Sequence, residues 1–288
     1  MRFLYDSDVR ALLKRHSIRP NKDRGQSFLT SLSVAHDIIN AAQLTEQDRV
    51  LEIGGGLGIL SDIIAKEVEY LYVVEIDAGL IRILAEHLDE YSNVTLIHGD
   101  ALSVDLPNIT KIVANLPYNV ASEITFRLLK ELSFESAIMM FQREFANRLL
   151  ALPGSSDYSR LSIDFQYMGV AEHKMDVEAS LFYPVPKVDS TVLEIRKRQE
   201  GVFAKDSQVF FWMVHGIYSY PNKQLKKALR IWFKLMKCAD EVDLVINHIQ
   251  QSIDTSTRLR SLRLSDLVQL ADLLLEMIVD GKLPDPRR

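Results

Sequence analysis

Alternating glycines follow an apolar run of the chain, and an acidic residue stands two positions before the first of them. Glu52 is followed by Gly54, Gly56 and Gly58. Because glycine has no Cβ, it allows a tight turn and the close approach of a ligand, and a helix that starts there offers free N–H groups. The third glycine comes one position too early for the dinucleotide pattern Gly-x-Gly-x-x-Gly, and Ile59 stands where that pattern needs Gly or Ala. The segment predicts a ligand-binding turn, disfavours a nicotinamide cofactor, and leaves open a purely structural turn.

Two more carboxylates stand where the next two apolar runs end. At the first of these ends, Glu75 can accept hydrogen bonds from both ribose hydroxyls of a nucleoside, or else cap the following helix. At the second, Asp100 and the adjacent backbone can hydrogen-bond an adenine ring. Open parallel sheets bind ligands at the carboxyl ends of their strands. We therefore expect Glu52, Glu75 and Asp100 to line one crevice.

The segment Asn115-Leu116-Pro117-Tyr118 follows a fourth apolar run and suits chemistry on an aromatic amine. An amine such as adenine N6 is a poor nucleophile because its lone pair is delocalised into the ring. Asn115 and a backbone carbonyl can accept its two protons and draw the nitrogen toward sp³ geometry, which frees the lone pair for attack on a sulfonium methyl group. Pro117 stiffens the loop, and Tyr118 offers a ring on which an extruded base can stack. Taken in isolation, the tetrapeptide also fits a simple proline turn.

Short apolar runs of strand length alternate with helical stretches through the first part of the chain. This pattern predicts an α/β fold with a mostly parallel, Rossmann-like sheet and crossover helices. The expected strands are 50–53, 71–76, 94–97, 112–114, 137–141 and 190–196, and the expected helices between them are 60–67, 79–91 and 121–132. A charged linker at 196–201 then leads to a small all-helical domain. Its expected helices are 207–220, 223–236, 239–250 and 265–279.

Composition and motif spacing exclude several classes of protein. The 288 residues are 47% hydrophobic and 25% charged, as in folded soluble proteins with room for a large and a small domain. The single Cys238 excludes an internal disulfide framework, and no His-x-x-x-His or Cys-x-x-Cys spacing is present, so we expect no catalytic metal. No apolar run reaches the roughly 18 residues that cross a bilayer. Since the N-terminal residues resemble neither a secretion signal nor a transit peptide, we expect a cytoplasmic location.

Charge is distributed unevenly along the chain. The net charge is −5, and residues 45–105 carry 13 acidic and 3 basic side chains. The first 24 residues, in contrast, hold seven Arg and Lys against three Asp. A predicted helix near residue 230 has an apolar stripe and no acidic residue, and its basic side chains form either a solvated face or a phosphate-binding surface. These candidate RNA-binding residues are Lys223, Lys226, Lys227, Arg230 and Lys234.

Several motifs together carry a resemblance to a known family. The tetrapeptide at 115–118 is similar to the hallmark of the ribosomal RNA adenine N6,N6-dimethyltransferases, and the glycine turn resembles motif I of class I methyltransferases that use S-adenosylmethionine. Gly55 stands where bacterial members commonly have proline, which favours an archaeal-type enzyme. Further stretches that resemble the family's motifs cover nearly the whole chain: 22–29, 142–148, 158–162, 182–190 (the second substrate loop), 222–229 and 260–265.

The resemblance implies a role for each matching residue. The implied catalytic residues are Asn115, Leu116, Pro117, Tyr118 and Phe182, with the rings of Tyr118 and Phe182 enclosing the target adenine. The implied cofactor contacts are Gln26, Ser27, Leu29, Gly54, Gly56, Glu75, Ile76, Asp100, Ala101 and Asn115. Ser27 departs from the asparagine or histidine usual at its position. For this residue the resemblance supports a backbone contact rather than a side-chain contact.

The resemblance also implies an activity and a domain organisation. Residues 1–198 form a class I methyltransferase domain dependent on S-adenosylmethionine, and residues 199–288 form a helical domain that binds RNA or the ribosome. The expected reaction transfers methyl groups to N6 of two adjacent adenosines near the 3′ end of small-subunit ribosomal RNA, by a monomer acting on a pre-assembled small subunit. Two alternatives stay open: a large-subunit RNA adenine methyltransferase of the antibiotic-resistance type, and a non-catalytic nucleic-acid-binding factor on the same fold.

Overall fold

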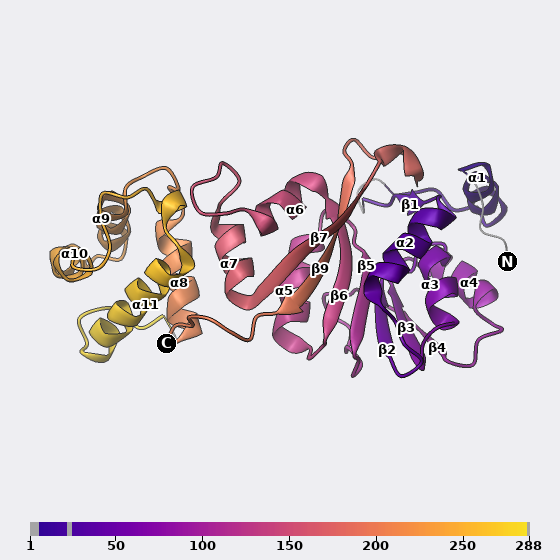
Figure 1. The fold of residues 1–288 in the computed structure, drawn as a ribbon, viewed down its shortest axis with the longest axis horizontal. Coiled ribbons are helices and arrows are strands. Elements are labelled where there is room, and N and C mark those ends of the chain that lie inside the picture. Colours follow the sequence, from indigo (N-terminus) through magenta and orange to yellow (C-terminus); the bar gives the residue numbers. More distant parts are fainter. Residues whose placement is uncertain (1–5, 22–24, 287–288) are drawn as a thin grey trace. The chain divides into compact units, whose positions relative to one another are not determined.

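The computed structural model describes residues 6–21 and 25–286, which fall into two compact units. The first unit contains the described residues up to Ala146, together with Gly169–Lys197. The second contains Asn147–Met168 and the described residues from Arg198 onward. The chain therefore leaves the first unit, returns to it for three strands, and leaves it again. The ribbon in Figure 1 follows this path by its colour.

A seven-stranded sheet forms the centre of the first unit, in the order β4-β3-β2-β5-β6-β9-β7. Strands β2 to β6 pair in parallel, whereas β9 pairs antiparallel with both β6 and β7. The mostly parallel α/β sheet expected from the sequence is thus confirmed. The strands are β2 (Arg49–Ile53), β3 (Tyr70–Glu75), β4 (Val94–His98), β5 (Lys111–Asn115), β6 (Ser136–Gln142), β7 (Gly169–Val177) and β9 (Ser190–Lys197).

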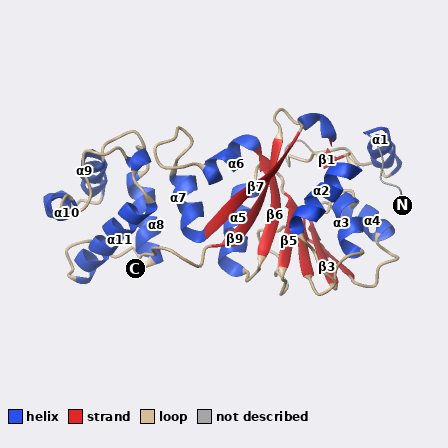
Figure 2. Ribbon diagram, viewed as in Figure 1, coloured by secondary structure: helices blue, strands red, loops and turns tan. Residues whose placement is uncertain are grey.

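Helices cover both faces of this sheet, as Figure 2 shows. One face is covered by α2 (Leu32–Ala42), α3 (Ile59–Ala65) and α4 (Ala78–His87), whose apolar side chains share a core with alternate strand residues such as Val50, Val113 and Ile138. On the other face lies α5 (Ala121–Glu131). An N-terminal helix, α1 (Asp6–Arg15), and a two-stranded sheet of β1 (Phe28–Leu29) and β8 (Phe182–Tyr183) complete the unit. A short 3₁₀ turn, Ala179–Leu181, precedes β8.

The second unit is helical and has a core of its own. It contains α7 (Arg160–Met168), α8 (Ser207–Ile217), α9 (Leu225–Leu235), α10 (Val242–Ile249) and α11 (Leu264–Val279), with 3₁₀ turns at Ala239–Glu241 and Leu259–Ser261. The buried face of α9 includes Leu225, Leu229 and Trp232, the stripe expected from helical spacing. A further helix, α6 (Arg143–Leu150), begins in the first unit and ends in the second.

The division into units departs from the expected domains in one stretch. Residues 147–168 belong to the helical unit, because Tyr158, Ile163 and Tyr167 are buried in its core. Strand β7 was not expected from the sequence either, because it lies at the edge of the sheet, buries only its first and last residues and lacks an apolar run. In the part of the chain that the structure describes, no helix is long and apolar enough to cross a membrane.

Candidate functional site

The glycine segment forms the turn between β2 and α3. Gly54 and Gly56 have φ values of +80° and +55°, a region that favours glycine. Gly55 is restricted by packing in this chain, because a Cβ here would overlap the Val73 side chain and press against Leu84. At Gly54, a Cβ would lie 3.2 Å from the carbonyl oxygen of Asn115. The turn is therefore packed closely against β3, α4 and the end of β5.

Glu75 holds this turn from the end of β3. Its two carboxylate oxygens accept hydrogen bonds from the N–H groups of Gly56, at 3.0 Å, and Asp77, at 2.9 Å. Burial raises the pKa of Glu75, and these N–H donors oppose the shift. The cap of α4 is Asp77, which accepts from the N–H groups of Gly79 and Leu80. The alternative interpretation of Glu75 as a helix cap is therefore wrong.

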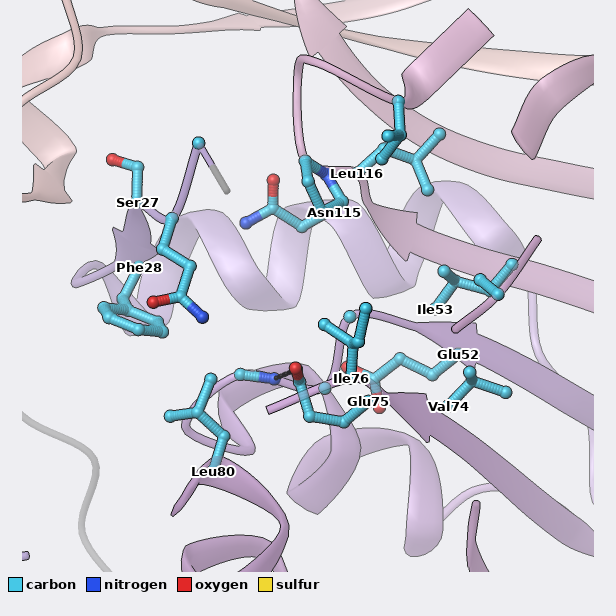
Figure 3. Close-up of a pocket in the computed structure, with 18 of the residues that line it drawn as sticks. Ser27, Phe28, Glu52, Ile53, Val74, Glu75, Ile76, Leu80, Asn115 and Leu116 are labelled. Carbon is cyan, nitrogen blue, oxygen red and sulfur yellow. Dashed lines mark hydrogen bonds between the residues drawn. The ribbon is translucent and has the colours of Figure 1, made fainter. Parts of the chain in front are cut away.

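A pocket of about 180 Å³ lies between this turn and the ends of the parallel strands. Figure 3 shows Glu75, Asn115 and Ser27 around it, contributed by three separate segments of the chain. Ile76 is 42% exposed although it is apolar, and so offers the pocket a hydrophobic surface. The structure brings together all the expected cofactor contacts and most of the expected catalytic residues: Gln26, Ser27, Leu29, Gly54, Gly56, Glu75, Ile76, Asp100, Ala101, Asn115, Leu116, Pro117 and Tyr118.

The loop after β5 presents Asn115 to the pocket. Among the described residues, the Asn115 amide has no hydrogen-bond partner. Leu116 is buried and anchors the loop, while the Pro117 carbonyl accepts the N–H of Val120 at 3.2 Å. The Tyr118 hydroxyl lies 2.8 Å from the Ser190 Oγ, and burial raises its pKa. Asn115 thus stands between strand β5 and an anchored loop, and its amide stays available to a ligand.

Phe182 does not line the pocket, so the expected enclosure of a base between Tyr118 and Phe182 is absent from this structure. Its side chain is 1% exposed and lies in the main core of the first unit. Neighbouring residues of a strand point to opposite faces. In the β1–β8 pair, Leu29 and Phe182 lie opposite each other and face this core, whereas the partners Phe28 and Tyr183 belong to a separate apolar cluster.

Ser27 joins the cofactor side of the pocket to the second substrate loop. Its hydroxyl donates a 2.6 Å hydrogen bond to the carbonyl oxygen of Pro184, and the pairing continues through β1 and β8 to Thr30, whose N–H bonds the Leu181 carbonyl. This pairing was not expected from the sequence, because strands of two residues carry no periodicity. Phe28 belongs to the motif at 22–29 but was not among the expected cofactor contacts, and it also lines the pocket, between Ser27 and Leu29.

Glu52 is a buried acid behind the glycine turn. It is 1% exposed and accepts a hydrogen bond from the Ser61 hydroxyl. Its pKa is raised to about 8, chiefly by burial and also by the nearby Glu75 carboxylate, while the hydrogen bond from Ser61 opposes the shift. Glu52 borders the pocket as expected, and at neutral pH it carries a proton.

The raised pKa of Glu52 predicts a pH-dependent stability. The folded protein keeps this proton up to about pH 8, whereas the unfolded chain loses it near 4.5. Between these values the folded state binds more protons, so its stability falls as the pH rises. We expect Glu52→Gln to remove this part of the slope, measured as the unfolding free energy in urea at several pH values. An unchanged slope in the variant would contradict the assignment.

The basic residues expected to bind RNA lie on or just before α9. Lys227, Arg230 and Lys234 are exposed, and Lys226 is half-buried. Lys223 lies two residues before the helix, outside the observed helical span, and is also exposed. The Arg230 guanidinium pairs with Asp243 of α10 at 3.0 Å. Its charge is therefore partly neutralised within the protein.

No group of three or more His, Cys, Asp or Glu side chains that could hold a metal ion is found within residues 6–21 and 25–286. The polar residues that line the pocket instead carry carboxylates, hydroxyls and the amides of Gln26, Asn115 and Asn119. This set suits hydrogen bonding to an organic ligand.

Comparisons with known proteins show the family of this chain. The family model described as ribosomal RNA adenine dimethylase matches residues 18–275. A probable ribosomal RNA small subunit methyltransferase A of Methanosarcina barkeri is 37% identical over 269 residues, which is 93% of this chain and 92% of that protein. Another, from Methanococcus aeolicus, is 41% identical over 215 residues, 74% of this chain and 79% of that protein. These archaeal relatives confirm the archaeal-type resemblance.

Two solved structures of methyltransferases have a fold similar to that of this chain. A dimethyladenosine transferase from Plasmodium falciparum has a TM-score of 0.77 and 26% identity, covering 88% of this chain and 98% of that one. The 23S rRNA methyltransferase ErmE has a TM-score of 0.63 and 25% identity, covering 85% and 98%. The fold is thus that of class I methyltransferases, as expected. With a family match over nearly its whole length, this chain belongs to the ribosomal RNA adenine dimethylase family and is an enzyme that methylates ribosomal RNA.

Proposed function

We propose that this enzyme transfers methyl groups from S-adenosylmethionine to N6 of two adjacent adenosines near the 3′ end of small-subunit ribosomal RNA. The observation that carries the proposal is the placement of Asn115 at the pocket, with its amide unpartnered among the described residues and its loop fixed by Leu116 and Tyr118. The curated relatives are named as small-subunit methyltransferases, which supports this choice of RNA.

The pocket residues fit the proposed cofactor. Each Glu75 oxygen accepts one backbone N–H and, with two lone pairs, has room for a ribose hydroxyl. Ile76 supplies an apolar surface for a flat ring, while Asp100 and the backbone of Ala101 supply polar atoms beside it. The glycine turn admits a ligand close to its backbone. When bound here, S-adenosylmethionine supplies an activated methyl group.

Asn115 acts on the other substrate. Its side-chain oxygen and a backbone carbonyl of the loop accept the two N6 protons of the target adenine, which favours sp³ geometry at the nitrogen and frees its lone pair. The rigid loop reduces the entropy lost on alignment. No protein base is needed, because the proton lost from nitrogen passes to water. Tyr118 supplies a ring against which the extruded base packs.

RNA affinity comes from the exposed cations of α9 and from Lys223, two residues before it. Replacing Lys223, Lys227 and Lys234 by Ala should weaken RNA binding and flatten its salt dependence, by roughly 0.7–0.9 log units per log unit of salt for each phosphate that is no longer neutralised. Cofactor affinity should not change. The measurement is the dissociation constant for ribosomal RNA across a salt series. If the triple variant kept the wild-type salt dependence, these side chains would form a solvated helix face that does not bind RNA.

Labelled methyl transfer tests the proposed function directly. Unmethylated small subunits, naked small-subunit RNA and large-subunit RNA are each incubated with the enzyme and S-adenosylmethionine, and the digested RNA is analysed by mass. We expect two adjacent dimethyladenosines, formed on the pre-assembled small subunit. The enzyme should act as a monomer, and its expected location is the cytoplasm. Label on large-subunit RNA alone would favour the ErmE-like alternative, and binding without transfer would favour a non-catalytic factor.

A further inference from the structure

The N-terminal helix has a buried apolar side and a basic outer side. Val9 and Leu13 of α1 are buried, whereas Lys14 and Arg15 are exposed. Arg19, four residues after the helix, is exposed as well. Between residues 9 and 20 the sequence has four Arg and Lys and no Asp or Glu. The outer side of this segment therefore carries a local positive charge, although the protein as a whole is acidic.

Packing places this helix directly against the wall of the pocket. Val9 and Leu13 share a small apolar cluster with Phe28, Leu57 and Leu80. The last three side chains also line the pocket on their other sides. In Figure 1, α1 lies at the end of the first unit that carries β1 and α4. The basic surface is thus one side-chain layer away from the site of chemistry.

A second contact, between α1 and β8, places one side of the helix next to the second substrate loop. The Arg10 guanidinium lies 4.7 Å from the centre of the Tyr183 ring, in the geometry of a cation–π contact. Lys14 follows Arg10 by one helical turn and so lies on the same flank. Tyr183 is the last residue of β8, and the loop that follows exposes Lys187. Cations of both elements therefore lie beside the second substrate loop.

We propose that the outer face of α1, with Lys14, Arg15 and the following Arg19, binds the phosphodiester backbone of the RNA strand whose adenosine enters the pocket. This inference rests on the proposed function. An enzyme that extrudes a base must hold the flanking phosphates close to its pocket. The acidic stretch 45–105 repels a polyanion, so cations beside the pocket are needed to offset it. Lysine and arginine do so while releasing counterions.

An acidic side chain of α4 lies close to this segment. The Glu86 carboxylate lies 3.9 Å from the His16 imidazole, on the side of α4. His16 is only partly exposed, and its neighbours Lys14 and Arg15 remain exposed. This approach involves His16 alone, and the side chains of Lys14 and Arg15 stay accessible to a partner.

Single substitutions with a matched control test the assignment. Lys14→Ala, Arg15→Ala and Arg19→Ala each remove one exposed cation beside the pocket, and Lys130→Ala removes one exposed cation from the last turn of α5. The dissociation constant for unmethylated small-subunit RNA is measured across a salt series for each variant, and that for S-adenosylmethionine at one salt concentration. Methyl transfer by the wild-type protein is followed in parallel.

We expect each of the three variants to lower the salt slope by roughly 0.7–0.9 for every phosphate that is no longer neutralised, while Lys130→Ala keeps the wild-type slope. Cofactor affinity should stay the same in all four. Unchanged slopes in the α1 variants, an equal effect in Lys130→Ala, or weaker cofactor binding instead of weaker RNA binding would each overturn the assignment. Failure of the wild-type protein to methylate any RNA would overturn the proposed function instead, so the two failures are distinguishable.

Discussion

Asn115→Ala should lose roughly 10²–10³ in single-turnover rate while both substrates still bind. This is the scale typical of one oriented hydrogen-bonding group acting at the transition state. The variant keeps the glycine turn, Glu75 and the loop anchors Leu116 and Tyr118, so the pocket itself should persist. Without the amide oxygen, the N6 nitrogen keeps its planar geometry and its delocalised lone pair. The rate is measured at saturating cofactor and RNA.

Asn115→Asp provides the matched comparison. Aspartate retains a side-chain oxygen that accepts a hydrogen bond at the same place, and we expect it to recover part of the lost rate. Separate titrations with cofactor and RNA distinguish a chemical defect from a binding defect. Near-normal dimethylation by Asn115→Ala would exclude the proposed role of this residue.

The parallel part of the fold was predictable because each of its strands is a mostly apolar run in the sequence. Each expected strand from 50–53 to 137–141 matches an observed strand to within one or two residues. Elements at the periphery lack this pattern. The edge strand β7 alternates irregularly between half-buried and exposed residues, and α7 joins the second core through tertiary contacts that no local pattern records.

The pocket was predictable for a topological reason. Gly54, Glu75, Asp100 and Asn115 all stand at or just after the ends of parallel strands, and the carboxyl ends of such strands meet at one edge. Residues positioned by pairing between distant segments were not predictable in this way. Ser27 bonds Pro184 across 157 positions of sequence, and a motif comparison alone describes Ser27 only as a departure from the usual residue. Its hydroxyl links the two loops that border the pocket.

Phe182 is the residue for which motif and structure differ most, and substitutions separate the two interpretations. Its side chain is 1% exposed, in a core with Leu29, Val177 and Val192. Phe182→Ala should therefore lower the unfolding free energy by about 3–5 kcal/mol, as for other buried aromatic residues. A residue that only stacked on a bound base would change stability little and RNA affinity by about 1–3 kcal/mol. Urea unfolding gives the first quantity.

Phe182→Leu separates the two roles even where the alanine variant fails to fold. Leucine keeps an apolar side chain in the core but removes the aromatic ring, so a packing role predicts a much smaller loss of stability and wild-type RNA affinity. Val185→Ala is the control in the same loop, because Val185 is 64% exposed and its truncation should leave stability unchanged. Weakened RNA binding by a stably folded Phe182→Leu would instead show that the ring leaves the core to meet the base. The β1–β8 pairing and the Ser27 hydrogen bond to Pro184 would then have to open during each methyl transfer, since Phe182 forms part of that pair.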